Sequence, residues 1–430
     1  MGRLNARFVG QTTFYCQLTA YYLGFAAAWA AVTDRSLNLE NFMTLTPLSA
    51  HKLPRRHLLG ALVSAPLALS GTVRALDASG RSINIGQSTA LSGPLAALGQ
   101  AMYQGAKAGF AAVNAAGGVN GRLIELTTLD DAYDVVKAVA NVKTLLDMPE
   151  QFALFNCMGT PMIEAMLPAV LASGVPFFAP FSGALSARPA NARNVFNIRA
   201  SYADEAEQLV RQLATIGVKR IAIAYQNNAF GKEVFEATQR AMIKYKVDAT
   251  AIATVESSAV DAAAAAAKIA TSNPEAVLLG LAGKPTIDFV KAIRQQRKGL
   301  PLYALSIMGA ASTLKAMGND ATGIAVSQVV PLPANAVMPI VRDFQVAWKA
   351  QANGAEPSHL ALEGYINARV FAEVLRRAGP RPTRAAFIDA GWALKQFDLG
   401  GFEVGFSDSS KNASRFVELT MVAQDGRFIR

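Results

Sequence analysis

Short apolar segments and segments with helical periodicity alternate along most of this chain, and this alternation restricts the fold more than any other feature. In one helix-like segment, Val135, Val139, Val142 and Leu146 recur at the spacing of a single helix face. The apolar segments that we predict as strands are 83–86, 124–129, 152–156, 177–179, 221–225, 251–255, 276–281 and 302–305. Such alternation is typical of parallel β-sheets covered by helices on both faces. The sequence therefore predicts an α/β fold.

The length of the chain indicates more than one domain. It has 430 residues, so we expect two α/β lobes. An amphipathic helix at 363–378 and a strand at 416–422 follow the two strand–helix series, so the chain is expected to cross between the lobes more than once. We predict doubly wound parallel sheets, with residues 81–200 and 329–395 in lobe I and residues 201–328 and 396–430 in lobe II.

The residues before the first predicted strand have the pattern of a targeting sequence. Arg55 and Arg56 precede an apolar stretch at 60–69, and small residues at Val73 and Ala75 follow it. This order is typical of a secretory signal, and the paired arginines suggest the twin-arginine route. We therefore predict a signal peptide at 43–75, cleaved near Ala75, with Ala78 as the alternative, and location in the periplasm.

Residues 1–42 precede this signal and allow two interpretations. The stretch 11–33 contains no charged residue and is long enough to span a membrane. Alternatively, Met43 is the true first residue and the preceding segment is an upstream extension. We favour the second interpretation, because a signal that starts at Met43 has a normal length.

Charge and cysteine content exclude several classes of protein. The formal net charge is +10, and the remainder after the first 75 residues has 34 basic and 29 acidic residues, or +5. These basic residues are scattered, whereas nucleic-acid-binding proteins usually have a clustered basic face, so no nucleic-acid partner is expected. Cys157 is the one cysteine beyond Cys16, so no internal disulfide is predicted despite the exported location. We expect Cys157 to be a small buried residue at the end of a strand.

The motifs of common catalytic sites are missing. The sequence has neither a G-x-S-x-G nucleophile elbow nor the glycine patterns of nucleotide-binding loops. Its histidines are His51, His57 and His359, of which the first two leave with the signal, and we expect His359 at the surface or at a helix start. Asp130, Asp131 and Asp134 could hold a metal ion, but we favour their binding the free N–H groups at the start of the following helix. We predict no catalytic residue, metal or cofactor.

Loops that follow four predicted strands instead indicate a binding site. They span 88–99, 158–161, 179–184 and 226–231, and they contain small hydroxyl residues and glycines before helices. Such loops leave backbone N–H groups free to bind an anion. Ligands of open α/β sheets bind at this end of the strands, so the sequence predicts a site for a small carboxylate.

At this point the chain resembles a known family. The motifs in question are TALSGPLAALG, GAKAGFAAVNAAGGVNGRLIEL, LDDAYD, VPFFAP, NNAFGKEVFEA, LEGYINARVFAEVLRRAG and VAQDGRF. In this order they resemble the periplasmic substrate-binding proteins of ABC transporters, of the leucine/isoleucine/valine-binding type. The resemblance implies two lobes joined by a three-strand hinge, closing over one small ligand. It also implies an inner-membrane ABC permease as partner, and a monomer is expected.

The resemblance also implies which residues bind the ligand. Thr160 matches a hydroxyl residue that grips the ligand carboxylate, and Ser182 lies between Phe181 and Gly183 on the next carboxylate-binding loop. The other expected ligand-binding residues are Leu98, Met158, Gly159, Phe230, Ala282, Met308 and Tyr365.

One departure from the family pattern bears on the ligand. The family's amino-acid binders hold the ligand ammonium with an acidic residue in the loop that is SIMGAAS here, at 306–312, where no carboxylate occurs. A buried ammonium without a counter-charge costs several kcal/mol. We therefore favour an organic acid with an aromatic or aliphatic body over an ordinary branched-chain amino acid. A ligand sensor of the same fold and a secreted α/β enzyme remain as alternatives to a transport receptor.

Overall fold

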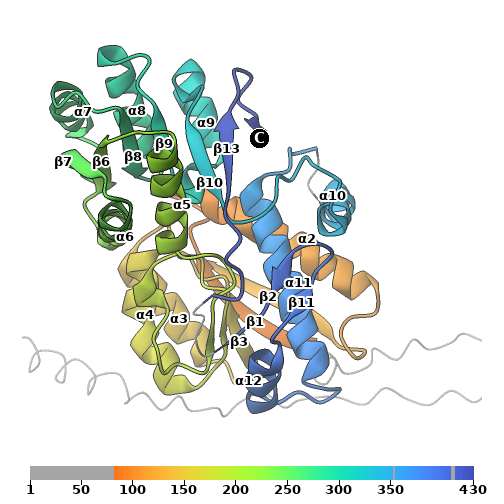
Figure 1. Cartoon of the computed structure of the whole chain (residues 1–430). Helices are drawn as coiled ribbons and strands as arrows, with labels where there is room; N and C mark the ends of the chain where they lie inside the picture. The colour runs from red at the N-terminus through yellow and green to blue at the C-terminus, as the bar shows by residue number, and fades with distance from the viewer. Residues whose placement is uncertain (1–81, 352–353, 408–411) are drawn as a thin grey trace, which may run out of the picture. The chain divides into compact units, whose positions relative to one another are not determined.

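The computed structural model describes residues 82–351, 354–407 and 412–430 (Figure 1). The predicted extension at 1–42, its uncharged stretch at 11–33 and the predicted signal at 43–75 lie outside these residues. Within the described ranges, no helix is both long and apolar enough to cross a bilayer.

The first sheet has five parallel strands. Their order is β2 (Leu123–Asp130), β1 (Ser82–Thr89), β3 (Gln151–Phe155), β4 (Phe177–Phe178) and β5 (Val195–Phe196). The helices α2 (Ala96–Ala115), α3 (Val135–Leu146) and α4 (Thr160–Ser173) connect its first strands. Neighbouring side chains on a strand point to opposite faces, so Phe155 and Phe178 pack with α2 while Leu154 and Phe177 pack with α3 and α4. Both faces are therefore covered.

The second sheet repeats this strand order and then extends it. Its parallel part runs β7 (Asp248–Val255), β6 (Arg220–Gln226), β8 (Ala276–Gly280), β9 (Leu302–Ala304) and β10 (Ala325–Gln328). Two antiparallel strands, β13 (Glu418–Val422) and β14 (Phe428–Ile429), continue it beyond β10. Its helices are α5 (Tyr202–Thr215), α6 (Ala229–Tyr245), α7 (Ala262–Thr271), α8 (Lys284–Gln296) and α9 (Ala311–Met317). The predicted architecture of two doubly wound α/β lobes is confirmed.

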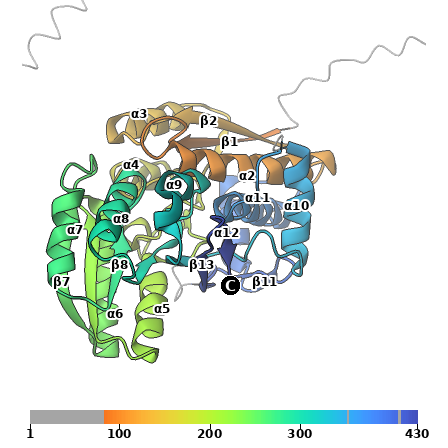
Figure 2. The ribbon, with the colours of Figure 1, turned by 90° about the horizontal axis from the view of Figure 1, so that it is seen from above.

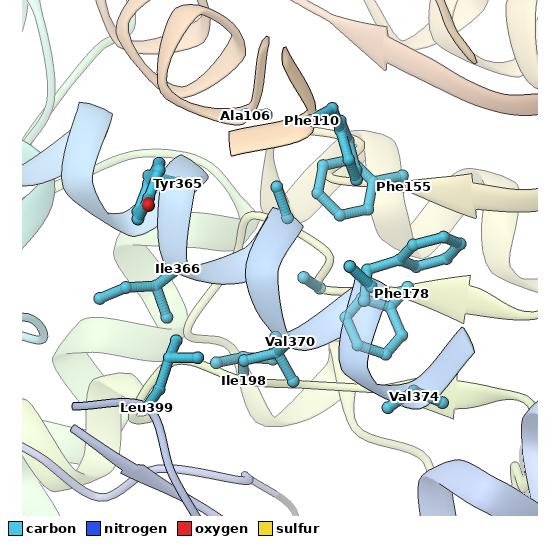
Figure 3. Close-up of a cluster of buried hydrophobic side chains, with 14 of the residues drawn as sticks. Ala106, Phe110, Phe155, Phe178, Ile198, Tyr365, Ile366, Val370, Val374 and Leu399 are labelled. Atoms are coloured by element: carbon cyan, nitrogen blue, oxygen red, sulfur yellow. The ribbon is translucent and has the colours of Figure 1, made fainter. Parts of the chain in front are cut away.

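Three late helices complete the first lobe: α10 (Pro339–Gln351), α11 (His359–Arg377) and α12 (Arg384–Ala393). Figure 2 shows α10 and α11 beside α2. α2 and α11 approach so closely that a Cβ atom on Gly105 would lie 1.8 Å from the Ala361 carbonyl oxygen. In the core between them and the sheet, Phe371 packs against Phe110 and Phe178. Figure 3 shows Phe110, Phe155 and Phe178 in this core. We call the first sheet with α2–α4 and α10–α12 lobe I, and the second sheet with α5–α9 lobe II.

The segment after α12 differs from the predicted division. The short strands β11 (Phe397–Asp398) and β12 (Glu403–Val404) form a hairpin whose Leu399 and Phe402 are buried in the core of lobe I. The predicted boundary at residue 396 assigned this segment to lobe II. Its apolar residues instead cover the part of the lobe I core around Phe196 and Phe178, which Phe406 contacts.

Within the described ranges the chain passes between the two sheets three times. The first passage follows β5, the second joins β10 to α10, and the third precedes β13. The first and third passages run side by side, because Ala413 N donates to Asn197 O and Ser414 N donates to Ile198 O. These segments correspond to the expected three-strand hinge.

Candidate ligand-binding site

A small cavity lies where the carboxyl ends of strands from both sheets face each other. Lobe I contributes Leu95, Leu98, Tyr133, Met158, Gly159, Thr160 and Phe181, and lobe II contributes Tyr202, Phe230, Ala282 and Ile307. The space open to the centre of a water-sized sphere is about 20 Å³. That volume suits about one water molecule, so the two lobes are closed against each other in this conformation.

Two loops of lobe I form a polar end of this cavity. Gly159 precedes α4 with φ of 96°, and no side chain caps the helix. The first turn of α4 therefore presents the N–H groups of Thr160 and Met162, which have no acceptor within the helix. The Thr160 and Ser182 hydroxyl oxygens lie 2.8 Å apart, and Gly159 N donates to Phe181 O at 3.1 Å. Free N–H groups and a hydroxyl at a helix N-terminus form an anion site.

The rest of the lining is aromatic and apolar. The Tyr202 and Phe230 rings meet nearly at right angles, with centroids 5.4 Å apart. Gly183 lies under the Tyr202 ring, where a Cβ atom would approach Cδ1 to 2.3 Å. Among the residues that the structure describes around the cavity, none has a charged side chain. Uncompensated charge in such surroundings is unfavourable unless polar groups bind it, so an apolar body with one anionic end matches this lining.

A buried network of ion pairs lies behind the rings of Phe181 and Tyr202, on the side of Arg199. The Arg199 guanidinium lies 5.3 Å from the Phe181 ring centroid and 5.9 Å from that of Tyr202. Its Nη2 is 3.3 Å from a Glu205 carboxylate oxygen, and its Nη1 is 3.6 Å from Glu363. All three charged side chains are almost completely buried, and burial raises the pKa of Glu363. Arg199 thus links Glu363 of lobe I to Glu205 of lobe II and engages both carboxylates.

The aspartates after β2 organise loops rather than forming a metal site. Asp130 accepts hydrogen bonds from the Ser92 hydroxyl and the Leu91 and Ser92 N–H groups, and the Ser92 hydroxyl is the main reason that its pKa falls to about 2. Asp134 caps α3 by accepting from Lys137 N, as predicted. Asp131 is buried against the Ser88 hydroxyl. Across the described ranges, no group of three or more His, Cys, Asp or Glu residues could hold a metal ion.

The structure brings together seven of the predicted ligand-binding residues at the cavity: Leu98, Met158, Gly159, Thr160, Phe181, Phe230 and Ala282. Ser182 lies behind Thr160, and Gly183 supports Tyr202. Met308 is buried in the lobe II core, and its neighbour Ile307 contacts the cavity instead.

Tyr365 is not at the cavity, contrary to expectation. It is buried in the lobe I core (Figure 3). Its ring centroid is 5.5 Å from that of Phe344, and its hydroxyl accepts from Arg369. The phase of α11 points this side chain toward α10. Cys157, predicted as a small buried residue, is fully buried, and burial raises the pKa of its thiol to about 12.

Four residues at the cavity were not predicted: Leu95, Tyr133, Tyr202 and Ile307. Tyr202 had a usable signal, because Ser201 and Asp204 form a capping box that starts α5 directly after the first passage between the lobes. Tyr133 had no such signal in the sequence. Its backbone, with φ of 62°, adopts a conformation that is rare for residues other than glycine, so nothing in the sequence indicates it.

Comparison with known proteins agrees with this geometry. Residues 82–427 match the family model for periplasmic binding proteins. A substrate-binding periplasmic protein from Ralstonia solanacearum is similar in structure, with a TM-score of 0.75 and 33% sequence identity, covering 81% of this chain and 99% of that one. A possible leucine/isoleucine/valine-binding protein from Rhodopirellula baltica SH 1 has a TM-score of 0.77 and 27% identity, covering 83% and 98%. An amino acid binding protein from Pseudomonas aeruginosa is 25% identical over 343 residues, which are 78% of this chain and 88% of the relative. The expected resemblance is thereby confirmed, and the chain belongs to the periplasmic binding protein family.

Proposed function

We propose that this protein is the solute receptor of an ABC importer and that its ligand is a small carboxylate with an aromatic or aliphatic body. The observation that supports this proposal is the combination at one cavity of an uncapped helix N-terminus, the Thr160 hydroxyl and an otherwise apolar lining. The carboxylate binds at the start of α4, and the apolar body lies against Phe181, Phe230 and Tyr202.

The absence of charge around the cavity favours an organic acid over an amino acid. An amino acid has an ammonium group, and a buried cation without a partner costs several kcal/mol. No cavity residue supplies a carboxylate, and Glu205 and Glu363 are already engaged by Arg199. Two distant proteins of the same fold illustrate this ligand class: one from R. palustris is described in complex with benzoate, and one from Thermomonospora curvata as a fatty acid ABC transporter substrate-binding protein.

Ligand entry requires that the lobes separate, because the closed cavity has room for about one water molecule. Glu233 of α6 joins the lobes in this conformation by accepting from Leu185 N and Ser186 N, at 3.3 and 3.0 Å. A ligand shifts the balance toward closure only if it binds the closed form more tightly than the open form. The closed form then docks on an inner-membrane permease, and no catalytic step is involved.

The proposal is tested by thermal shift and calorimetry with benzoate, octanoate and leucine. We expect benzoate or octanoate to stabilise the protein, by about 2.7 kcal/mol at a ligand concentration of 100 times Kd, and leucine to have no effect. Thr160→Val should weaken carboxylate binding. The matched control is Thr144→Val on α3, whose exposed hydroxyl donates to Ala140 O within the same helix. Stabilisation by leucine alone would show that the ligand class is wrong.

A further inference from the structure

Tyr133 has an unusual place at the polar end of the cavity. It lies in the connection between β2 and α3, and its ring rests on Gly159, the residue that precedes α4. A Cβ atom built on Gly159 would lie 2.9 Å from Cε2 of Tyr133. The ring is therefore next to Gly159, and Tyr133 lines the same cavity as Thr160, at the end where the proposed function places the ligand carboxylate.

The backbone at this position adopts a conformation that side chains disfavour. Ala132 and Tyr133 have φ angles of 51° and 62°. For residues other than glycine, the left-handed region costs roughly 1–2 kcal/mol each. Hydrogen bonds from Ala132 N to Asp130 and from Tyr133 N to Asp131, both 2.9 Å, hold this geometry. Asp131 is itself buried and accepts from the Ser88 hydroxyl at 2.8 Å.

The Tyr133 hydroxyl is available to a ligand. It makes no hydrogen bond within the described part of the chain, although the ring is partly buried at the cavity. Burial raises the pKa of Tyr133, so the phenol keeps its proton at neutral pH and can donate it to an acceptor. A strained backbone that presents an unused donor at a cavity indicates a ligand-binding role.

We propose that the Tyr133 hydroxyl donates a hydrogen bond to the carboxylate of the bound ligand and so selects carboxylates over their neutral amides. This inference depends on the proposed function and extends it to one further specificity-determining residue. A hydrogen bond to a charged group contributes about 1.5–3 kcal/mol, which corresponds to an affinity change of about 10- to 100-fold. A neutral amide oxygen accepts a weaker bond, so the same hydroxyl contributes less to its binding.

The test compares Tyr133→Phe with the wild-type protein by calorimetry, using benzoate and octanoate and their amides. The ring remains in Y133F and keeps its packing on Gly159, so we expect carboxylate affinity to fall about 10- to 100-fold and amide affinity to change little. The ratio of the two affinities is the decisive quantity, because a general loosening of the site would lower both. Tyr133→His, which retains a ring N–H donor, should recover part of the ratio. If Y133F folds poorly, Tyr133→Leu, which also lacks the hydroxyl, provides the measurement in its place, and the same fall in the ratio is expected.

Tyr103→Phe is the matched control, since Tyr103 lies on α2, outside the cavity lining. It should leave both affinities unchanged. If the wild-type protein binds benzoate or octanoate and Y133F has the same ratio, the inference about Tyr133 is wrong while the proposed function stands. If the wild-type protein binds neither carboxylate, both are wrong.

Discussion

His359 provides a stability prediction whose size follows from its surroundings. It is the first residue of α11 and is 4% exposed, and its ring meets that of Phe428 edge-on at 5.1 Å between centroids. Its Nε2 is buried and makes no hydrogen bond within the described residues. Burial lowers the pKa of His359 from 6.5 to about 3. The helix N-terminus adds to this effect, because it disfavours a cation.

The sign of the pH dependence follows from the lowered pKa. The unfolded chain takes up a proton on this histidine below about pH 6.5, whereas the folded protein does so only near pH 3. The free energy of unfolding is therefore highest above pH 6.5, where the histidine is neutral in both states. It decreases as the pH falls toward 3, because the unfolded chain binds the proton first. Between pH 8 and pH 5 the loss from this one group should be about 2 kcal/mol.

Urea unfolding of wild type and His359→Phe at pH 8 and pH 5 measures this contribution. Phenylalanine keeps an aromatic ring against Phe428 and does not titrate, so the variant should lose about 2 kcal/mol less on acidification. All other titrating groups are common to the two proteins and cancel in the comparison. Equal losses would refute the reasoning, because they would mean that His359 titrates in the folded protein as it does in the unfolded chain.

Two further variants test how the lobes are built and joined. Gly105→Ala should destabilise the protein by about 3 kcal/mol or more in urea unfolding, since its Cβ would lie 1.8 Å from Ala361 O and force α2 away from α11. Gly299→Ala, which meets nothing within 4 Å, should stay within about 1 kcal/mol of wild type, and equal effects would contradict this packing argument. Glu233→Ala removes the acceptor that joins the lobes and should increase the radius of gyration in X-ray scattering without a comparable loss of stability. Glu236→Ala on the same helix is the control, because Glu236 pairs with Arg240 within that helix. An unchanged scattering profile for both variants would show that Glu233 does not hold the lobes together.

Much of the fold could be predicted because periodicity and burial agree there. The helix at Val135–Leu146 has the predicted limits, and β1, β3, β6 and β8 lie within a few residues of the predicted strands. The elements that were not predicted include β5 and β11, which have two residues each and too few side chains to form a pattern. The hairpin at β11 and β12 was assigned to the wrong lobe for a related reason. Apolar residues in a short irregular segment do not reveal which core they enter.

Residues of the site could be predicted where they lie on loops that directly follow strands. They could not be predicted where the orientation of a helix decides whether a side chain faces the cavity. Thr160 and Phe181 follow β3 and β4, and the parallel arrangement brings them together. The prediction for Tyr365 was wrong because α11 is buried on nearly all sides around this residue, and the polar Glu363 and Asn367 are buried with it. The amphipathic pattern of this helix therefore does not indicate which buried side chain faces the cavity. His359 was expected at the surface or at a helix start, and it lies at a helix start but is buried.

The position of α11 in the chain has a consequence for biosynthesis. Phe371 packs against Phe110, Phe155 and Phe178, so α2 covers one face of the first sheet only in part until this late helix is synthesised. The parallel strands of the second sheet, from Arg220 to Gln328, are contiguous and have no such dependence. A nascent chain therefore can complete the sheet of the second lobe while the first, although made earlier, still exposes an aromatic surface. Domains usually fold in the order of their synthesis, and exposed apolar surface promotes aggregation. Aggregation of the nascent chain is accordingly expected to be greatest in the interval before α11 emerges.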